Sequence, residues 1–344
     1  RAVLNFPLSE LRFSRSFIEA ISNIKLAAAQ TNMELGLLEE KLGTAIVEAA
    51  TEVAGGKFDA QFVVDIFQTG SGTSTNMNAN EVISNRSIEL LGGELGSRTP
   101  VHPNDHVNTG QSSNDVIPTA IHVAAAKSIK DNLIPSLVQL KNSLETKSKE
   151  FMPIIKTGRT HLQDATPVRL GQEFEGHAGQ IERGIQRCEQ ALIELSEVAL
   201  GGTAVGTGVN THPEFAKKVC QKISSSLDID IHETNNHFQA QSTLDNIVQA
   251  SGSMKTIAVS LMKIANDIRW MGSGPRGGFG EIELPEVQPG SSIMPGKVNP
   301  VIPESVCQVA AQVIGNDTTV SIAGQSGNFE INVMMPVAAH NLLQ

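Results

Sequence analysis

Cysteine and positive charge are both scarce in this sequence of 344 residues. The three cysteines, at positions 188, 220 and 307, are too few and too widely spaced for a disulfide framework, a zinc pair or iron–sulfur ligands. Such cysteine usage is typical of a reducing compartment. The 26 Lys and Arg are outnumbered by 36 Asp and Glu, for a formal charge of −10, which argues against a general nucleic-acid binder.

Long apolar runs are also missing. No stretch approaches the ~18 residues of a membrane helix, so we expect no transmembrane segment. With 40% hydrophobic and 18% charged residues, the chain is neither disordered nor collagen-like. Its length allows about two domains and a sizeable core. The chain opens on Arg1 and no signal peptide is visible, although a removed leader would leave the same picture.

Helical periodicity dominates the pattern of apolar residues. Over 171–200 and 240–270, apolar side chains recur at alternating steps of three and four, as on one face of a long helix. Two more long helices are predicted, from Asn114 to about Lys149 and over 302–323. Near-heptad spacing sustained over about 30 residues predicts a bundle of long, nearly antiparallel helices, and we interpret the apolar stripes as core packing.

The N-terminal part is predicted to hold shorter helices. They are expected near 14–35, 44–54 and 76–92. Strand signal is sparse and falls at 153–157, 227–232 and 280–284. The sequence therefore predicts an all-α fold, with a smaller, mainly helical N-terminal domain over 1–111 and a long-helix bundle over 112–344.

Two polar segments have the composition of an anion site. The segment 68–80 combines glycines, which let backbone N–H groups approach a ligand, with hydroxyl and amide donors. The segment 102–115 ends where a long helix should begin, and the free N–H groups and positive dipole of a helix start favour an anion. Each segment also has a purely structural explanation, as a capped turn.

Two further segments carry titratable side chains. His161 lies in the polar run 157–167, among donors and turn formers rather than on an apolar face. The Gly/Pro-rich segment 289–300 brings two serines, Lys297 and Asn299 close to a helix start, and has the composition of a lid that carries chemistry. A structural histidine and a simple surface loop are the alternatives.

Together these segments resemble the fumarase/aspartase superfamily. GSSIMPGKVNP at 290–300 resembles its signature, and TGSGTSTNMNANEV at 69–82, VHPNDHVN…QSSND at 101–115 and GRTHLQDATPVRLGQEF at 158–174 resemble its other conserved blocks. The resemblance runs over essentially the whole chain and in order. It is strongest to the class II fumarases, because the aspartases carry Gln in place of His161, Asn in place of His102 and Ala in place of Gly296.

The resemblance implies a hydro-lyase of the citric acid cycle that hydrates fumarate reversibly to L-malate, with no cofactor and no metal. It implies Ser291 as the base, His161 as the acid, and Glu304 as the residue that orients His161. The reverse scheme, in which His161 and Glu304 activate a water as base, stays open. The remaining implied residues are the catalytic cation Lys297, the substrate-binding residues Ser71, Thr73, Asn76, Ser112, Ser113, Asn114, Thr160, Lys297 and Asn299, and a second anion site at His102, Asn104 and Asp105.

The resemblance also implies a cytoplasmic homotetramer, or a mitochondrial one if a leader has been removed, with each active site built from three chains. Its implied partner is a small dicarboxylate, and neither nucleic acid nor membrane.

Three departures from the family pattern stand out. The family usually has Lys-Ser where this chain has Thr109-Gly110, so a positive charge is missing there; residues 301–305 look more like an aspartase; and the family's small C-terminal domain is absent from this chain.

Two other functions stay open at this point. An ammonia-lyase such as aspartase would share the fold, and His161 argues against it. A helical structural protein that has lost its activity would not be expected to keep costly polar groups, because drift erodes these first. The retained groups are Ser291, Lys297, Asn299, His161 and Glu304.

Overall fold

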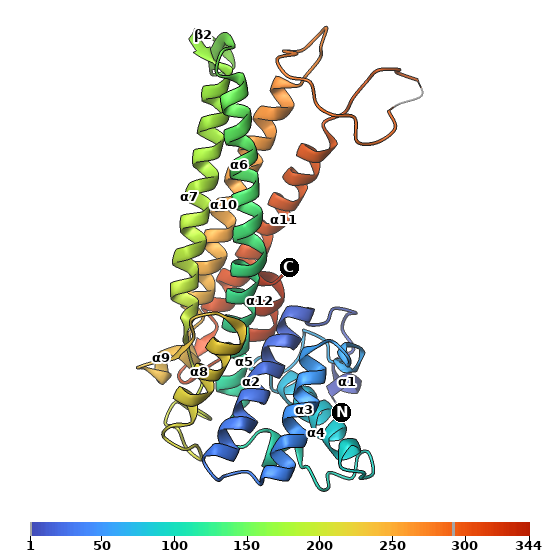
Figure 1. Ribbon diagram of the computed structural model, residues 1–344, viewed down its shortest axis with the longest axis vertical. Helices are drawn as coiled ribbons and strands as arrows, with labels where there is room; N and C mark the ends of the chain where they lie inside the picture. Colours follow the sequence, from blue (N-terminus) through green and yellow to red (C-terminus); the bar gives the residue numbers. More distant parts are fainter. Residues whose placement is uncertain (1, 291–292) are drawn as a thin grey trace. The chain divides into compact units, whose positions relative to one another are not determined.

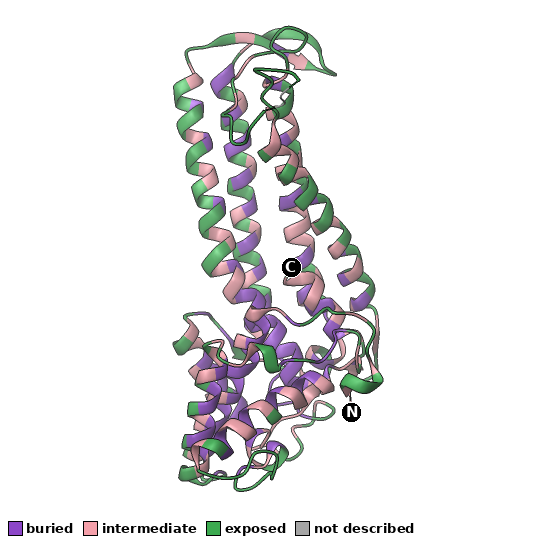
Figure 2. Cartoon of the chain, turned by 90° about the vertical axis from the view of Figure 1, so that its right-hand side faces the viewer, coloured by how far each residue is buried: buried purple, intermediate pink, exposed green. Residues whose placement is uncertain are grey.

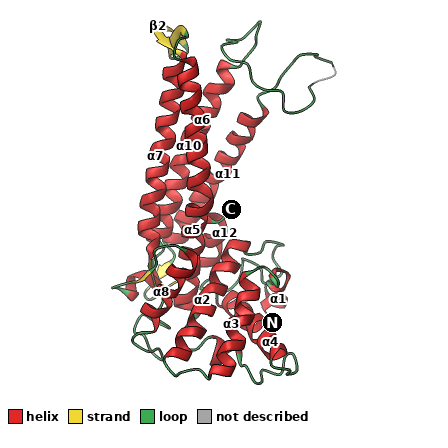
Figure 3. Ribbon diagram, viewed as in Figure 1, coloured by secondary structure: helices red, strands yellow, loops and turns green. Residues whose placement is uncertain are grey.

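The computed structural model describes residues 2–290 and 293–344, and most of these residues are helical (Figure 3). Strands are few in this described part of the chain, where they form three two-stranded sheets. The all-α fold class predicted from the sequence is confirmed. None of the described helices is long and apolar enough to cross a membrane.

The chain divides into two compact units, which are described separately. The first unit runs up to Asn132 and resumes over Gln190–Ser251 and Asp317–Gln344. The second unit combines Leu133–Glu189 with Gly252–Asn316. This division into compact units does not test the domain boundary predicted at 111/112, which therefore stays a prediction.

Helix α2 organises the first unit. Its fully buried side chains Phe17, Ile21 and Ile24 recur at steps of four and three, so they share one face of the helix. Helix α2 contacts four other α-helices and the π-helical turn η2, and Figure 2 shows many buried residues on the helices of this unit. These helices are α2 (Arg15–Glu34), α3 (Glu40–Ala54), α4 (Thr73–Leu90), α5 (Ser113–Ser128) and α8 (Phe215–Leu227).

Short elements complete the first unit. Helix α12 (Met335–Leu342) contacts α5, and the backbone N–H of Met335 donates to the carbonyl of Gly70 at 3.0 Å. This bond fixes the C-terminal segment to the loop that leads into α4. The other short elements are α1 (Ala2–Asn5), η1 (Asp59–Gln61), η2 (Pro103–Val107), η3 (Ile129–Leu133), β3 (Glu197–Val198), β4 (His232–Glu233), α9 (His237–Ser242), β5 (Gly327–Asn328) and β6 (Ile331–Asn332).

Long helices form the second unit, and Figure 1 shows α6, α7 and α10 side by side. The hydroxyl of Ser148 on α6 donates to the carbonyl of Gly171 on α7 at 2.8 Å. Gly184 of α7 lies so close to Ile257 of α10 that an added Cβ would be 3.3 Å from it. The elements that contribute are α6 (Ile134–Phe151), β1 (Ile155–Thr160), β2 (Gln163–Arg169), α7 (Leu170–Ser196), α10 (Asp245–Met271) and α11 (Val301–Gly324).

The apolar stripe predicted on 171–200 is present. Phe174, Ala178, Ile181 and Cys188 are all buried on α7, which confirms the packing face. Apolar side chains are also exposed in this unit, on α10 at Val259 and on α11 at Ile302 and Val309.

The long helix predicted from Asn114 to about Lys149 is confirmed as an uninterrupted helical stretch, but its geometry is not α-helical throughout. The chain forms α5, a π-helical turn over Ile129–Leu133, and then α6. Pro135 in the first turn of α6 explains the π-helical turn, because proline lacks an N–H and its ring clashes with the carbonyl four residues earlier. The strand expected at 280–284 is wrong: these residues are described and form no strand. The strand β2 was not predicted.

A tight contact at Gly70 generates a stability prediction. A Cβ at this position would lie 1.8 Å from the carbonyl oxygen of Val333, which is backbone and cannot rotate away. Gly70→Ala should therefore destabilise the fold by about 1–3 kcal/mol, the usual cost of overpacking. Urea unfolding measures this loss in the free energy of unfolding. Gly55→Ala is the control, because its Cβ would meet only ordinary contacts at 3.4 Å; an equal loss in both variants would contradict the prediction.

Candidate active site

Two helix N-termini meet in the first unit and bring three predicted substrate-binding hydroxyls together. Thr73 opens α4 and Ser113 opens α5, and their hydroxyl oxygens lie 2.9 Å apart. The hydroxyl of Ser71 lies 2.9 Å from that of Thr73. All three side chains are half-buried. Because the first N–H groups of a helix have no intrahelical partner and carry positive potential, this arrangement suits a carboxylate.

Glycine permits this close approach. Gly72, just before α4, has φ +74°, a conformation that favours glycine. A Cβ there would lie 2.9 Å from Cγ2 of Ile117 on α5. The glycine-rich composition of 68–80 therefore serves helix packing as well as any ligand.

The start of α5 is fixed by a buried carboxylate. The backbone N–H of Ser112 donates to Oδ1 of Asp115 at 2.9 Å, while the Ser112 hydroxyl accepts from the N–H of Asn114 at 3.2 Å. The other oxygen of Asp115 accepts from the N–H groups of Gly201 at 3.1 Å and Thr203 at 2.9 Å. Burial raises the pKa of Asp115, and these backbone donors act in the opposite direction.

Two predicted binding residues also carry structural bonds. The side-chain amide nitrogen of Asn114 donates to the carbonyl of Ala204 at 2.7 Å. The side-chain oxygen and the backbone of Asn114 remain beside Ser113. Asn76 is buried one turn into α4, and its amide donates to Oδ1 of Asn108 at 3.2 Å. Asn76 therefore supports the loop before α5, and a direct role in substrate binding stays a prediction.

The residues of the predicted second anion site lie together on one turn. Nδ1 of His102 accepts from the backbone N–H groups of Asn104 at 3.3 Å and Asp105 at 3.2 Å. His102 thereby caps the π-helical turn η2 (Pro103–Val107), and the side chains of Asn104 and Asp105 are exposed. The cap gives these residues a structural role, and anion binding here stays a prediction.

In the second unit, His161 is displayed at the tip of a hairpin. Strands β1 and β2 pair up to Thr160 and Gln163, so His161 and Leu162 are the two turn residues. They have φ +56° and +59°, as the favoured hairpin turn requires of both central positions. Non-glycine residues rarely adopt this conformation, and such strain is common at functional sites. His161 and Thr160 are both exposed.

A cluster of charged residues holds this hairpin in place. Nζ of Lys156, which is largely buried, pairs with Glu173 at 2.8 Å and with Glu281. Nη1 of Arg159 pairs with Glu281 at 2.6 Å, and its guanidinium lies 4.1 Å from the ring centroid of Phe279. The sequence offered no signal for this network, because its members are up to 125 residues apart.

The described residues of the segment 289–300, the predicted lid, also belong to the second unit. Lys297 and Asn299 are exposed, and Glu304 is half-buried in the first turn of α11. Ser291 lies outside the described residues. Among the described residues, no hydrogen bond or ion pair joins His161, Lys297 and Glu304 to one another.

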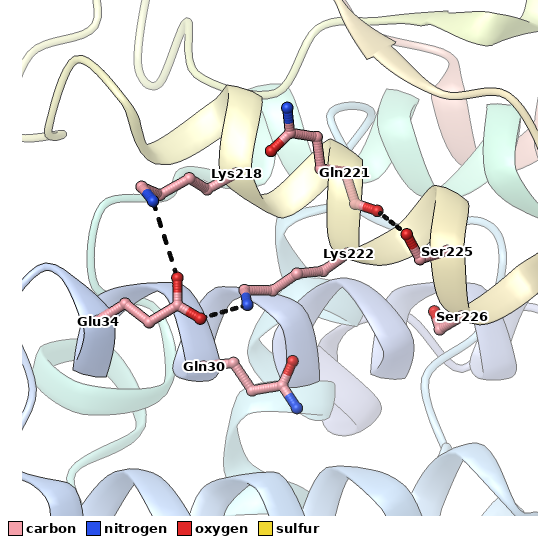
Figure 4. Close-up of a pocket in the computed structure, with 7 residues that line it drawn as sticks. All are labelled: Gln30, Glu34, Lys218, Gln221, Lys222, Ser225 and Ser226. Atoms are coloured by element: carbon pink, nitrogen blue, oxygen red, sulfur yellow. Dashed lines mark hydrogen bonds and ion pairs between the residues drawn. The ribbon is translucent and has the colours of Figure 1, made fainter.

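The hollow shown in Figure 4 is not this site. It has a volume of about 400 Å³ and lies between α2 and α8 of the first unit. Its one carboxylate, Glu34, is paired with Lys222 at 2.5 Å and with Lys218 at 3.9 Å, which leaves one net positive charge among the lining residues. None of the predicted site residues lines it. Within the described part of the chain, no group of three or more His, Cys, Asp or Glu side chains could hold a metal ion.

Comparison with known proteins agrees with the motifs. A sequence model of the lyase family matches residues 1–315. Class II fumarate hydratase from Nitrosomonas europaea is 52% identical over 344 residues, which cover 100% of this chain and 74% of that protein. The enzyme of the same name from Halobacterium salinarum is 56% identical over 344 residues, covering 100% of this chain and 73% of that protein.

A solved structure is also similar. The crystal structure of class II fumarase from Schistosoma mansoni matches with a TM-score of 0.96 and 41% sequence identity, covering 100% of this chain and 75% of that one. The chain therefore belongs to the lyase family. Within it, the relatives to which it is similar along its whole length are class II fumarate hydratases, as the sequence motifs imply.

The charged cluster generates a prediction about the hairpin. Glu281→Gln removes the carboxylate shared by Lys156 and Arg159 and leaves both cations under-paired, so β1 and β2 should open more often. Hydrogen exchange at 155–169 should become at least ~10-fold faster, equivalent to ~1.4 kcal/mol of local stability. Glu283→Gln, an exposed carboxylate two residues on, is the control. Equal exchange in the two variants would exclude this role.

Proposed function

We propose that this chain catalyses the reversible, stereospecific hydration of fumarate to L-malate, as a class II fumarate hydratase. The observation that carries the proposal is the meeting of the α4 and α5 N-termini at Thr73 and Ser113. Neutral hydroxyls and helix N–H groups can bind a carboxylate on a protein whose net charge is −10. The relatives named fumarate hydratase, at 52% and 56% identity, support the same assignment.

The chemistry sets clear requirements. Dehydration of malate removes a weakly acidic proton beside a carboxylate and expels hydroxide, so negative charge builds up on that carboxylate. Donors that are already oriented, together with a cation, stabilise this aci-carboxylate. We assign this role to Lys297 and Asn299. Thr73, Ser112, Ser113, Asn114 and Thr160 would fix the substrate carboxylates, with Ser71 and Asn76 supporting them.

Two groups must then exchange protons. We assign Ser291 as the base that takes the proton from carbon, and His161 as the acid that protonates the leaving hydroxyl, with Glu304 orienting His161. A serine is a poor base unless neighbouring amides and a cation such as Lys297 stabilise its alkoxide. The competing scheme uses His161 and Glu304 to activate a water and leaves Ser291 without a chemical role.

We propose that these residues meet in a homotetramer whose active sites are shared between chains. The exposed apolar side chains Val259, Ile302 and Val309 on the long helices support such an assembly, because burial between subunits removes them from water. Exposed His161, Lys297 and Asn299 are available to a neighbouring chain. The chain that contributes Thr73 and Ser113 to a site need not be the one that contributes His161.

The reaction and the free cysteine thiols indicate the pathway and the compartment in which we propose that the enzyme acts. Interconversion of fumarate and malate is a step of the citric acid cycle, and we place the enzyme there, acting without a metal. Cys188, Cys220 and Cys307 are all free, which favours a reducing compartment. We therefore propose a cytoplasmic enzyme, with the mitochondrial matrix as its place if a leader has been removed.

A substrate test separates this function from ammonia-lyase activity. Following the ultraviolet absorbance of fumarate, we expect it to form from L-malate, to be consumed when supplied, and not to form from L-aspartate. Activity should survive a metal chelator. Turnover of aspartate but not malate would refute the proposal, and loss of activity with the chelator would refute only its metal-free part.

Substitutions in the lid separate the two proton-transfer schemes. Ser291→Ala should lower kcat by at least ~10²-fold, the usual scale for a general acid–base group, with little change in KM. His161→Asn should also slow turnover. Ser292→Ala in the same loop is the control. Near-wild-type turnover of Ser291→Ala would favour the scheme in which His161 and Glu304 activate water.

A further inference from the structure

Lys25 is the most deeply buried cation of the described first unit. It lies on α2 with no exposed surface. Its Nζ donates to Oδ1 of Asn108 at 2.8 Å and to Oε1 of Gln111 at 3.0 Å. Both acceptors are neutral amides. A buried ammonium without a directly bound carboxylate is costly, and such groups are seldom kept for stability alone.

Both acceptors belong to the turn that immediately precedes Ser112 and the start of α5. Oδ1 of Asn108 also accepts from the amides of Asn76 and Asn80, each at 3.2 Å, while its own amide donates to the carbonyl of Gln111 at 3.1 Å. The amide of Gln111 donates to the carbonyls of Val107 at 3.1 Å and Thr109 at 3.2 Å. Lys25 is therefore the one charged member of a network of amides.

The charges around Lys25 are few. From α5, the buried Asp115 acts on it through space, while the turn and α4 present only the amides already named. Helix α8 carries Lys218 and Lys222, which pair with Glu34 nine residues further along α2. Helix α3 carries three acids: Glu40 and Glu48 are exposed, and Glu52 pairs with Arg86 and Lys57. The turn η2 carries the exposed Asp105 and the half-buried His106. Burial lowers the pKa of Lys25 to about 7, and the field of Asp115 acts in the opposite direction.

We propose that Lys25 is a positioning residue of the dicarboxylate site, whose ammonium ion holds the Asn108–Gln111 turn so that the start of α5 can bind a substrate carboxylate. The proposal rests on the function proposed above. Because coupling is reciprocal, a carboxylate bound at Ser113 must also favour the protonated form of Lys25.

Binding of succinate tests this without any turnover. Succinate is a saturated four-carbon dicarboxylate that cannot be hydrated. Its dissociation constant for the wild type should rise as pH increases above about 7, by up to tenfold per pH unit, because deprotonated Lys25 must regain its proton. Calorimetry in two buffers of different ionisation enthalpy should show proton uptake on binding at pH 8. Absence of uptake in the wild type would overturn the proposal, whether or not any variant folds.

Substitution of Lys25 separates positioning from simple packing. Lys25→Met should weaken succinate binding at least ~10-fold at pH 6.5, the scale of a lost charge-assisted hydrogen bond, and should abolish the proton uptake. For turnover of malate, KM should rise while kcat changes less than threefold. Lys41→Met, at an exposed lysine of α3, is the matched control and should change neither.

These experiments distinguish a failure of the role proposed for Lys25 from a failure of the proposed function. Unchanged proton uptake in folded Lys25→Met would overturn the role of Lys25. If the wild type bound succinate with the expected pH dependence but did not interconvert fumarate and malate, the assignment of Lys25 would stand and the proposed function would fall.

Discussion

The buried carboxylate of Asp115 is the constraint on which the candidate binding site depends. It accepts hydrogen bonds from the backbone N–H groups of Ser112, Gly201 and Thr203, and so joins the first turn of α5 to a segment about ninety residues away. With the start of α5 fixed, Ser113 can meet Thr73 of α4 at 2.9 Å. Lys25 holds the turn just before α5 through the side-chain amides of Asn108 and Gln111. The hydroxyls are therefore set in place with the help of two buried charges.

Local sequence patterns predicted several of the helices and the segments that carry the candidate site. Apolar spacing located α7 and α10, and composition located the segments that carry Thr73, Ser113 and His161. Long-range polar contacts left no trace in the sequence: Lys25 meets Asn108 across 83 residues, and Arg159 meets Glu281 across 122. The hairpin β1–β2 was missed in part because its turn residues, His161 and Leu162, are not the usual glycine or asparagine. Pro135 was the overlooked signal for the π-helical turn between α5 and α6.

The residues assigned to chemistry fall into two sets with different physical character. In the first unit, neutral hydroxyls and helix N-termini can hold a carboxylate without titrating near neutral pH. In the second unit, His161, Lys297 and Glu304, to which we assign proton transfer and charge stabilisation, lie on a hairpin tip and beside a helix start. The two sets answer the two needs of the proposed reaction, orientation of a dianion and stabilisation of the charge that develops on it. The central claim is that the first set of a site comes from one chain and the second set from other chains of the tetramer.

Complementation between two inactive variants tests this claim most directly. One variant carries Thr73→Ala and Ser113→Ala, and the other carries Lys297→Met; each should be nearly inactive alone. After unfolding and refolding together, up to about a quarter of the sites in a random mixed tetramer would combine two intact sets, so substantial fumarate hydration should return. Mixed tetramers that form but regain no activity would contradict the claim, because they would place both sets of every site on the same chain.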